Sequence, residues 1–455
     1  MNQTAIQDFR ARLRGEMLLP SHAGYEEGRR IYNAMIDRRP SLIVRCASTE
    51  DVVAAVQFAR EHSLPVSVKG AGHNVAGNAV CEGGVMIDCS RLKGIAIDTA
   101  QRTATAQAGL TLGDFDKGTT EHGLFTTMGV VSKTGIAGLT LGGGLGWLMG
   151  KFGLACDNLI GAEVVTAEGK VLRADEQENP DLLWGLRGGG GNFGIVTRFE
   201  YRLHPMEPFL GGLILYSGSE LESMLRCYRE RVAACPDELT LYAAMQDLPD
   251  GTPACGFGVA YCGEPAAGES AVAPLRKFGK PLADTVALVP YVQHQAMFDE
   301  AYPPGLYHYW KANMMGQLSD EAIGLIAEYF RTRPSPLSQM FFEYIHGAAS
   351  RVAPEATAFA HRSERFNFSV FVIWRDPREA EANLAWLQKF WRDMQPHFAR
   401  GVYVNYLSQE GAERVREAYG PNYERLAALK QQYDPTNFFR LNQNIAPKAG
   451  AAGND

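Results

Sequence analysis

The sequence lacks the short motifs that mark several common classes of nucleotide-dependent and metal-dependent enzymes. No Gly-Lys pair is followed by serine or threonine, which removes the P-loop, and no His-Glu-x-x-His pair offers a zinc site. The eight cysteines form no Cys-x-x-Cys pair and no dense framework, so buried thiols are the first interpretation. A bridge between Cys255 and Cys262 is the alternative.

Long apolar runs and concentrated basic charge are missing as well. The first twelve residues are polar and amphipathic, without the apolar core of a signal peptide, and no later run is long enough to cross a bilayer. A net charge of −7 without a basic patch argues against a nucleic-acid partner. We therefore expect a cytoplasmic protein with neither a membrane nor a nucleic-acid partner, whose oligomeric state the sequence leaves open.

Three glycine-rich segments stand out in the first half of the chain. They span residues 70–74, which end at His73 and Asn74, residues 134–147, and residues 186–197. Successive backbone N–H groups in glycine-rich turns form concave anion sites, although simple turn chemistry explains any one of them alone. The third contains Gly189-x-Gly191-x-x-Gly194 but continues into residues 195–203, which alternate like a strand. A dinucleotide fingerprint requires a helix there, so the pattern excludes a Rossmann fold.

The apolar periodicity divides the chain into two regions of different texture. Up to residue 205 it predicts an α+β lobe, with a helix over 48–60 opened by a Ser48 to Asp51 capping box and strands at 64–69, 84–88, 103–108, 162–166 and 195–203. Beyond it, strands at 212–217, 239–245, 255–261, 339–346 and 367–374 alternate with helices at 220–234 and 379–395. The second pattern predicts a sheet backed by helices on one face.

Four motifs in sequence order carry a family resemblance. The His73 loop, the second and third glycine segments, and the closing stretch with Tyr403-Val-Asn405-Tyr406 and residues 433–444 resemble berberine-bridge-enzyme-like flavoproteins of the vanillyl-alcohol-oxidase and p-cresol-methylhydroxylase superfamily. The chain departs from the family's pattern at two positions of the first loop, with Lys69 in place of an arginine and Ala71 in place of a glycine. The resemblance implies an α+β fold: a two-lobed FAD-binding domain at 1–205, a substrate domain on an antiparallel sheet at 206–401, a returning C-terminal module at 402–447, and a flexible tail at 448–455.

The resemblance also implies the cofactor and its contacts. FAD is expected to be bonded covalently to a ring nitrogen of His73, and the position that matches a second, cysteinyl attachment is Val131, so a single covalent bond is predicted. The other residues expected near the cofactor are Lys69, Gly70, Ala71, Gly72, Asn74, Thr134, Gly135, Gly138, Gly142, Gly144, Gly194, Val196 and Asn442. No metal site is predicted.

Catalytic groups are expected mainly in the closing module. Tyr403 and Asn405 lie two apart, so a strand there would put them on one face with Tyr406 on the other. The family often uses tyrosine as the base that takes a hydroxyl proton, and Tyr403 is the expected one; a core tyrosine with a bonded hydroxyl is the alternative. Near the substrate we expect Glu343, Tyr344 and His346, with Tyr344 and His346 facing one side of a strand.

These expectations together describe an FAD-dependent enzyme that oxidises a hydroxyl-bearing small molecule such as a sugar, a polyketide or a phenolic alcohol. Thr134 falls where family comparisons place the residue beside the flavin carbon that reacts with oxygen, and its modest size favours an oxidase that releases hydrogen peroxide. Two alternatives stay open: a dehydrogenase with another electron acceptor, and a non-catalytic protein that binds flavin or another ligand.

Overall fold

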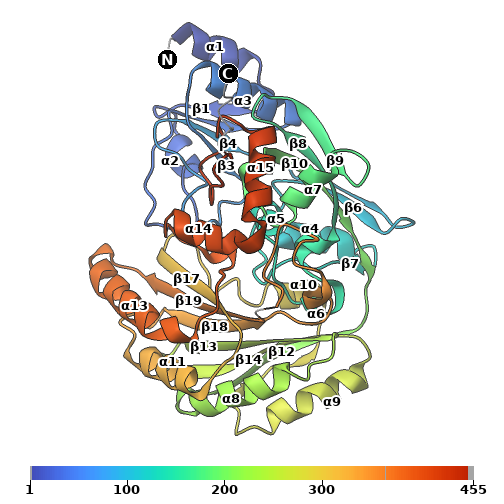
Figure 1. Ribbon diagram of the computed structural model, residues 1–455, viewed down its shortest axis with the longest axis vertical. Helices are drawn as coiled ribbons and strands as arrows, with labels where there is room; N and C mark the ends of the chain where they lie inside the picture. The colour runs from blue at the N-terminus through green and yellow to red at the C-terminus, as the bar shows by residue number, and fades with distance from the viewer. Residues whose placement is uncertain (1–2, 364, 449–455) are drawn as a thin grey trace, which may run out of the picture.

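The computed structural model describes residues 3–363 and 365–448, so most of the tail predicted at 448–455 lies outside the described residues. Three sheets dominate the molecule. Two of them and their helices form the upper half of Figure 1, and an eight-stranded sheet with its helices forms the lower half. The chain is therefore α+β, as predicted. The proposed limits at residues 205 and 401 stay predictions.

The first sheet places the His73 loop at the end of a buried parallel strand. Its order is β1 (Glu16–Leu18), β2 (Leu42–Arg45), β4 (Val85–Asp88) and β3 (Val66–Lys69), with β2, β4 and β3 parallel. Helix α3 (Thr49–Glu61) is capped by the Ser48 hydroxyl, which accepts from the Asp51 N–H at 3.4 Å, so this half of the predicted capping box is confirmed. The Asp51 carboxylate accepts from the N–H groups of Arg14, Gly15 and Ala47 instead of from Ser48, so the reciprocal half is wrong. Helices α1 (Gln3–Ala11) and α2 (Tyr25–Gly28) complete this layer.

The second sheet is antiparallel and carries the third glycine segment. Its order is β5 (Ile95–Asp98), β6 (Thr103–Gln107), β10 (Ile195–Arg202), β8 (Leu159–Val165) and β9 (Val171–Asp175). The glycine fingerprint thus runs into strand β10, as the sequence predicts. The remaining elements of this half are α4 (Leu112–Thr120), α5 (Ile136–Leu141), α6 (Met149–Phe152), α7 (Pro180–Leu186) and the short pair β7 (Leu124–Phe125) and β11 (His204–Pro205).

The eight-stranded sheet has helices on one face and leaves its other face toward the glycine loops. Its strands are β15 (Ala283–Asp284), β12 (Phe209–Ser217), β14 (Pro253–Cys262), β13 (Leu239–Asp247), β18 (Gln339–Tyr344), β19 (Phe366–Trp374) and β17 (Tyr307–Met315) in that order, and β16 (Ala287–Leu288) also pairs with β12. Helices α8 (Leu221–Val232), α9 (Pro265–Arg276), α11 (Asp320–Thr332) and α13 (Ala380–Met394) lie along its outer side in Figure 1. Met340, Phe342 and Tyr344 pack toward these helices. Strand alternation therefore turns Gln339, Phe341 and Glu343 to the inner face.

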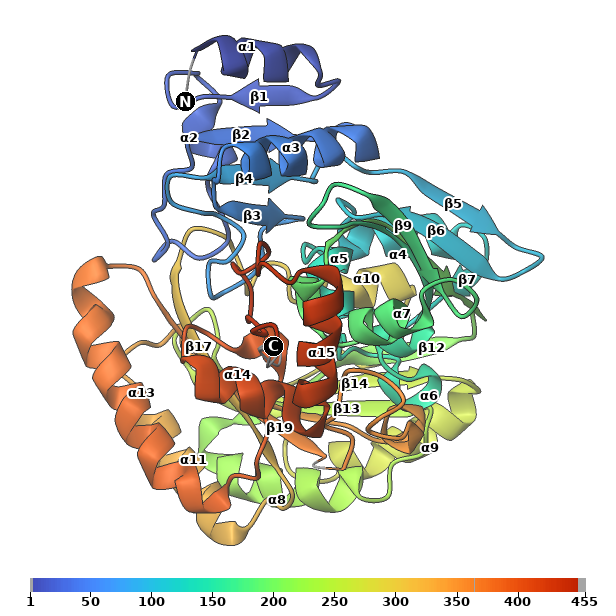
Figure 2. The ribbon, with the colours of Figure 1, turned by 45° about the horizontal axis from the view of Figure 1, so that its top comes forward.

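The C-terminal segment returns to the first half of the molecule. Helices α14 (Ala412–Tyr419) and α15 (Tyr423–Tyr433) lie centrally in Figure 2, and the buried Lys430 ammonium donates to the Asn192 carbonyl at 2.7 Å and to Asp434 at 2.6 Å. The strand predicted at Tyr403 is wrong. The chain forms a 3₁₀ turn over Val404–Tyr406 there.

Smaller elements and the cysteines complete the description. Helices α10 (Tyr291–Gln295) and α12 (Gly347–Arg351) join the larger strands. All eight cysteines are free, so the alternative of a Cys255–Cys262 bridge is wrong; the two residues lie toward opposite ends of β14. Among the described helices, none combines the length and apolar character needed to span a bilayer.

Candidate active site

A cavity of about 320 Å³ lies between the glycine loops and the inner face of the eight-stranded sheet. The structure brings together most of the residues predicted from the sequence. Those that line the cavity are Gly70, Ala71, Gly72, His73, Asn74, Val131, Thr134, Gly135, Gly138, Gly142, Gly194, Val196, Tyr403, Asn405, Tyr406 and Asn442. Lys69, Gly144, Glu343, Tyr344 and His346 are not among the lining residues.

His73 presents a neutral imidazole to this cavity. Its ring stacks on Tyr32 with centroids 4.1 Å apart, and His308 stacks on the other side of Tyr32 at 4.5 Å. Burial lowers the pKa of His73 to about 4, so the ring keeps an unprotonated nitrogen at neutral pH. An imidazole nitrogen with a free lone pair is the form that can act as a nucleophile.

The loop before His73 fits the pyrophosphate of a dinucleotide. The backbone N–H groups of residues 70–73 donate to no other protein group within the described part of the chain. Gly72 has φ of +76°, which glycine adopts without strain. A run of free N–H groups in such a turn binds anions. The residues present therefore fit FAD at this end.

Two further glycines leave room that a side chain would fill. A Cβ atom added to Gly138 or Gly191 would meet no protein atom within 4 Å. Nearby, the Asn442 side chain donates to the Gly191 carbonyl at 3.1 Å, while its own amide oxygen is buried and has no partner among the residues that the structure describes. A bound polar ligand would fill the open space beside these glycines and could donate a hydrogen bond to the Asn442 amide oxygen.

Lys69 and Gly144 do not line the cavity and make contacts within the protein, so their predicted cofactor contacts stay predictions. The Lys69 ammonium donates to the Gly28 carbonyl at 3.1 Å and pairs with Asp88 at 3.4 Å, because strand alternation turns it away from Val68, which lines the cavity. Gly144, with φ of +84°, uses its N–H to donate to the Tyr403 hydroxyl. At Gly142 glycine is required for a protein contact, since a Cβ would lie 2.1 Å from Asn405 Oδ1.

Tyr403 is held by three hydrogen-bond donors. Its hydroxyl oxygen accepts from the N–H groups of Gly144 at 3.0 Å and Leu145 at 3.3 Å and from the Asn405 amide at 2.9 Å. Burial nonetheless raises the pKa of Tyr403, with these bonds opposing the shift. The arrangement ties the second glycine loop to the C-terminal module.

Tyr406 contacts a buried carboxyl group. Its hydroxyl lies 3.2 Å from Glu343 Oε1, and the Asn367 amide donates to Glu343 Oε2 at 2.7 Å. Burial raises the pKa of Glu343 to about 7, with both hydrogen bonds opposing the shift. The Tyr403 and Tyr406 rings are 4.8 Å apart, so the prediction of opposite faces is wrong: a 3₁₀ turn brings residues three apart onto one side.

Tyr344 and His346 lie side by side as predicted, with ring centroids 6.0 Å apart, but neither of them lines the cavity. Strand β18 ends at Tyr344, whose ring packs in the helix-side core against Phe366. His346 lies beyond the strand as the N-cap of α12, and its Nδ1 is 3.1 Å from the Tyr344 carbonyl. Of the three residues predicted near the substrate, Glu343 alone lies on the cavity side of the sheet.

Comparisons with known proteins agree with this geometry. Residues 40–175 match the family model described as FAD binding domain, and residues 402–446 match berberine and berberine like. The chain is 32% identical over 452 residues to (R)-6-hydroxynicotine oxidase of Paenarthrobacter nicotinovorans, covering 96% of this chain and 97% of that one. It is 31% identical over 420 residues to an FAD-linked oxidoreductase of Dictyostelium discoideum, covering 91% of each. The chain belongs to the berberine-bridge-like FAD-linked oxidoreductases.

The fold of a solved relative supports the same assignment. The crystal structure of 6-hydroxy-D-nicotine oxidase from Arthrobacter nicotinovorans superposes with a TM-score of 0.89 at 30% identity, covering 96% of this chain and 98% of that one. The flavoprotein family that the sequence resembles is therefore confirmed. Within the described residues, no group of three histidine, cysteine, aspartate or glutamate side chains could hold a metal ion.

Several residues at the cavity were not predicted from the sequence. Tyr32, in the loop before β2, lies beside the cavity. The cavity wall includes Tyr302, Trp310 of β17, Phe341 of β18, Phe371 of β19, and Tyr242 and Gln246 of β13. Strand β17 itself was missed. Tyr307 and Tyr309, aromatic residues two apart in this stretch, were the sequence signal that could have predicted the strand.

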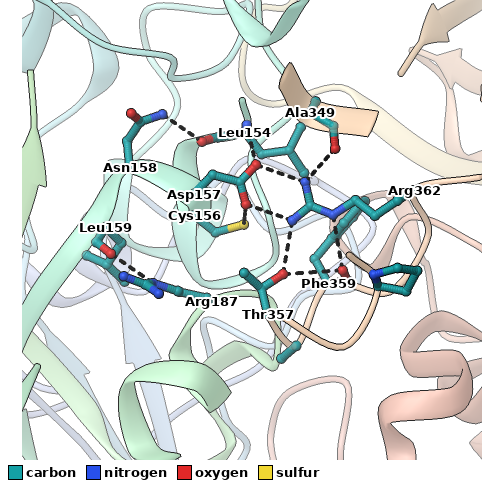
Figure 3. Close-up of polar contacts among 12 residues, drawn as sticks. Leu154, Cys156, Asp157, Asn158, Leu159, Arg187, Ala349, Thr357, Phe359 and Arg362 are labelled. Carbon is teal, nitrogen blue, oxygen red and sulfur yellow. Dashed lines mark hydrogen bonds and ion pairs between the residues drawn. The ribbon is translucent and has the colours of Figure 1, made fainter. Parts of the chain in front are cut away.

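A buried ion pair fixes the second glycine loop from behind. Arg362, whose side chain is 1% exposed, donates to Asp157 Oδ2 at 2.8 Å and to Oδ1 at 2.7 Å, and also to the Ala349 carbonyl and the Thr357 hydroxyl at 2.9 Å (Figure 3). The residue before Asp157, Cys156, donates its N–H to the Gly143 carbonyl at 2.8 Å. The pair therefore anchors the segment on which the loop rests.

Proposed function

We propose that this berberine-bridge-like protein oxidises a hydroxyl-bearing small molecule, with FAD attached through one covalent bond to His73 and oxygen as the electron acceptor. The observation that carries the proposal is the cavity itself. A neutral histidine, a loop of free backbone N–H groups and a tyrosine bonded to a buried carboxyl all border the same space.

The residues that would hold FAD come from both ends of the chain. The N–H groups of residues 70–73 would bind its phosphates, and the Asn442 amide oxygen is a free acceptor nearby. Bound FAD supplies a two-electron acceptor that takes a hydride from carbon and can pass its electrons to oxygen. Val131 carries no thiol, so His73 remains the single nucleophile at the two positions that the family resemblance assigns to attachment.

The proton of the substrate hydroxyl needs a separate route. The Tyr406 hydroxyl can accept that proton while it gives its own to Glu343, so no free phenolate forms. Glu343 suits this role because its carboxyl group titrates near neutral pH. Tyr403 suits it less, since its hydroxyl contacts three donors and, among its hydrogen-bond partners in the described residues, no carboxyl group that could take its own proton. We therefore assign the proton transfer to Tyr406 and Glu343, with Asn405 and Tyr403 positioning the turn.

The choice of oxygen as acceptor rests on Thr134 and on one relative. Thr134 lines the cavity with a side chain of modest size. The relative that is 32% identical is named an oxidase, (R)-6-hydroxynicotine oxidase. A dehydrogenase with another acceptor would have the same cavity but slow reaction with oxygen.

The proposal is tested on the purified protein. After acid precipitation the yellow colour should stay with the polypeptide, and a tryptic peptide spanning His73 should carry the added mass of FAD. Anaerobic mixing with a substrate should bleach the flavin, and air should restore it with release of hydrogen peroxide. Flavin that leaves entirely on denaturation would refute the covalent bond, and flavin that no alcohol, phenol or sugar bleaches would refute the oxidation.

A further inference from the structure

The cavity wall opposite the glycine loops is aromatic. Trp310 of β17 and Phe371 of β19 are register partners whose rings stack at 3.8 Å with planes 10° apart. Phe341 of β18 meets Phe371 edge to face at 4.6 Å, and Tyr406 meets Phe371 at 5.1 Å. Phe341 and Tyr406 remain partly exposed, whereas Trp310 and Phe371 are buried behind them. The inner face of the sheet therefore presents ring surface to whatever binds beside the cofactor.

The same cavity has no charged lining. Across the part of the chain that the structure describes, no aspartate, glutamate, lysine or arginine side chain lines it. The Glu343 carboxyl group lies behind Tyr406. A charged group on a ligand would lose its hydration here without gaining an ion pair. The wall consequently favours a ligand that is neutral where it touches the sheet.

Several polar atoms on this wall already have partners. The Trp310 indole N–H donates to His308 Nδ1 at 3.3 Å, the Tyr302 hydroxyl donates to Gln339 Oε1 at 2.5 Å, and the Tyr406 hydroxyl is engaged by Glu343. The groups left for a ligand are the Tyr242 hydroxyl, which has no hydrogen-bond partner within the described residues, the Gln246 side chain and the amide nitrogen of Gln339. A sugar would bury several hydroxyls here, and each one without a partner costs roughly tenfold in affinity.

From these three observations we infer that the substrate is a neutral, planar aromatic compound that carries the reacting hydroxyl, and not a sugar or a charged metabolite. The inference rests on the proposed oxidation and narrows its substrate class. The ring would lie against Phe341, with the hydroxyl directed to Tyr406. Offset or edge-to-face ring contacts add affinity beyond the area that they bury. Gln246 and the Gln339 amide can orient one or two further polar substituents.

Four matched probes test this on the FAD-loaded full chain. They are 4-hydroxybenzyl alcohol, its saturated counterpart 4-(hydroxymethyl)cyclohexanol, the protonated 4-hydroxybenzylamine, and glucose. Binding is followed as a change in the flavin absorbance, and turnover as anaerobic bleaching. We expect the aromatic alcohol to bind at least roughly tenfold more tightly than its saturated counterpart, and glucose to show no saturable binding.

Two variants locate the effect in the wall. Phe341→Leu should weaken binding of the aromatic alcohol by roughly fivefold to tenfold and leave the saturated counterpart nearly unchanged. Trp310→Leu should act in the same direction and serves if the first variant folds poorly. Trp386→Leu is the control, because this residue packs against Phe390 beneath the far face of the sheet and should leave every probe unchanged.

The outcomes separate the substrate class from the proposed function. Saturable binding of glucose equal to that of the aromatic alcohol, tighter binding of the protonated amine, or binding of none of the four would overturn the aromatic, neutral substrate. A protein whose flavin absorbance reports selective binding of the aromatic alcohol, but whose flavin is never bleached, would leave the wall's preference standing and overturn the proposed oxidation instead.

Discussion

The guanidinium of Arg362 donates to both carboxylate oxygens of Asp157, joining two segments that are 205 residues apart in the chain (Figure 3). The pair is almost fully withdrawn from water, with side chains 1% and 10% exposed. Asp157 also accepts the Leu154 N–H at 2.8 Å. One carboxylate therefore fixes both the turn after the second glycine loop and the segment that packs against it through Phe359.

Breaking this pair should destabilise the protein strongly. Arg362→Met leaves the Asp157 carboxylate buried without its counter-charge, and such a loss typically costs ~3–5 kcal/mol of unfolding free energy. Denaturant unfolding of the flavin-loaded protein measures it. Arg416→Met is the control, because its pair with Glu424 is 59% and 69% exposed and should contribute roughly 0–1 kcal/mol. Equal, small effects of both substitutions would show that the buried pair is not what secures this loop.

Replacing His73 tests the attachment independently of turnover. His73→Ala removes the nucleophilic nitrogen but leaves the free N–H groups of residues 70–73, so we expect FAD to bind non-covalently and to leave on acid precipitation. Tyr32→Leu is a useful companion, since it removes the ring on which His73 stacks while keeping the nitrogen. A wild type and a His73→Ala variant that lose flavin equally would contradict the covalent bond.

The glycine loops and His73 could be predicted because their signal is local. Each loop is a short run in which glycine spacing, the neighbouring strand and the histidine lie next to one another in sequence. The same is true of the helix cap at Ser48 and of strand β10 after the third loop. Such features depend on backbone conformation and on nearest neighbours, which the sequence displays directly.

The cavity wall could not be predicted because it depends on register between distant strands. Trp310 faces Phe371, and Asn367 faces Glu343, only through the pairing of β17, β18 and β19. A shift of one residue would have turned Phe341 into the helix-side core and Met340 into the cavity. At Tyr403 the error was of another kind: a single 3₁₀ turn replaced a strand and brought Tyr406 beside Tyr403, while Asn405 stayed in contact with it as predicted.

The two tyrosines of the closing module should differ in their effects on flavin reduction. Tyr406→Phe removes the hydroxyl that contacts Glu343, and we expect the reductive half-reaction to slow by roughly 10²–10⁴-fold with flavin still bound. Tyr403→Phe removes an acceptor for two loop N–H groups and should mainly lower stability and flavin retention. Stopped-flow reduction under anaerobic conditions compares them. A large loss in Tyr403→Phe beside near-normal reduction in Tyr406→Phe would return the role of base to Tyr403.

Because of Glu343, the rate of flavin reduction and the stability of the protein should depend on pH in opposite directions. Its pKa is raised to about 7 from an ordinary value of 4.5, so the carboxylate that accepts the proton forms as the pH rises through 7, and reduction should accelerate there. The folded state holds a proton that the unfolded chain releases above 4.5. Its contribution to stability, on the order of 3 kcal/mol, is therefore fully present below pH 4.5 and is lost as the pH rises through about 7.

Glu343→Gln removes both dependences, because an amide neither accepts the proton nor ionises. Reduction should be slow and nearly flat between pH 6 and 8, roughly 10²-fold below the wild type at the upper end. Melting temperatures of the variant should fall less than those of the wild type over the same interval. A variant whose reduction keeps the wild-type pH profile would remove Glu343 from the proton route.

Access of oxygen to the site should depend on the size of the residue at position 134. The backbone of Thr134 is fixed on both sides: its N–H donates to the Val131 carbonyl at 3.1 Å and its carbonyl accepts from the Leu112 N–H at 2.8 Å. Gly135 beside it lies against Ala71, where an added Cβ would come within 3.0 Å. A larger side chain at 134 therefore has to extend into the cavity, since the loop has little freedom to withdraw.

Thr134→Leu should slow reoxidation of the reduced protein while flavin reduction by substrate stays largely intact. Added bulk in a packed site typically costs ~1–3 kcal/mol, which corresponds to a rate lower by roughly tenfold to a hundredfold. Thr134→Val is the matched control, because it removes the hydroxyl at nearly constant size and should reoxidise like the wild type. Stopped-flow mixing of each reduced protein with air-saturated buffer, with peroxide measured at the end, decides between the two explanations. Slow wild-type reoxidation would make the protein a dehydrogenase, whereas a leucine variant as fast as the wild type would show that position 134 does not control oxygen access. If the valine variant alone were slow, the hydroxyl and not the available space would be what oxygen requires.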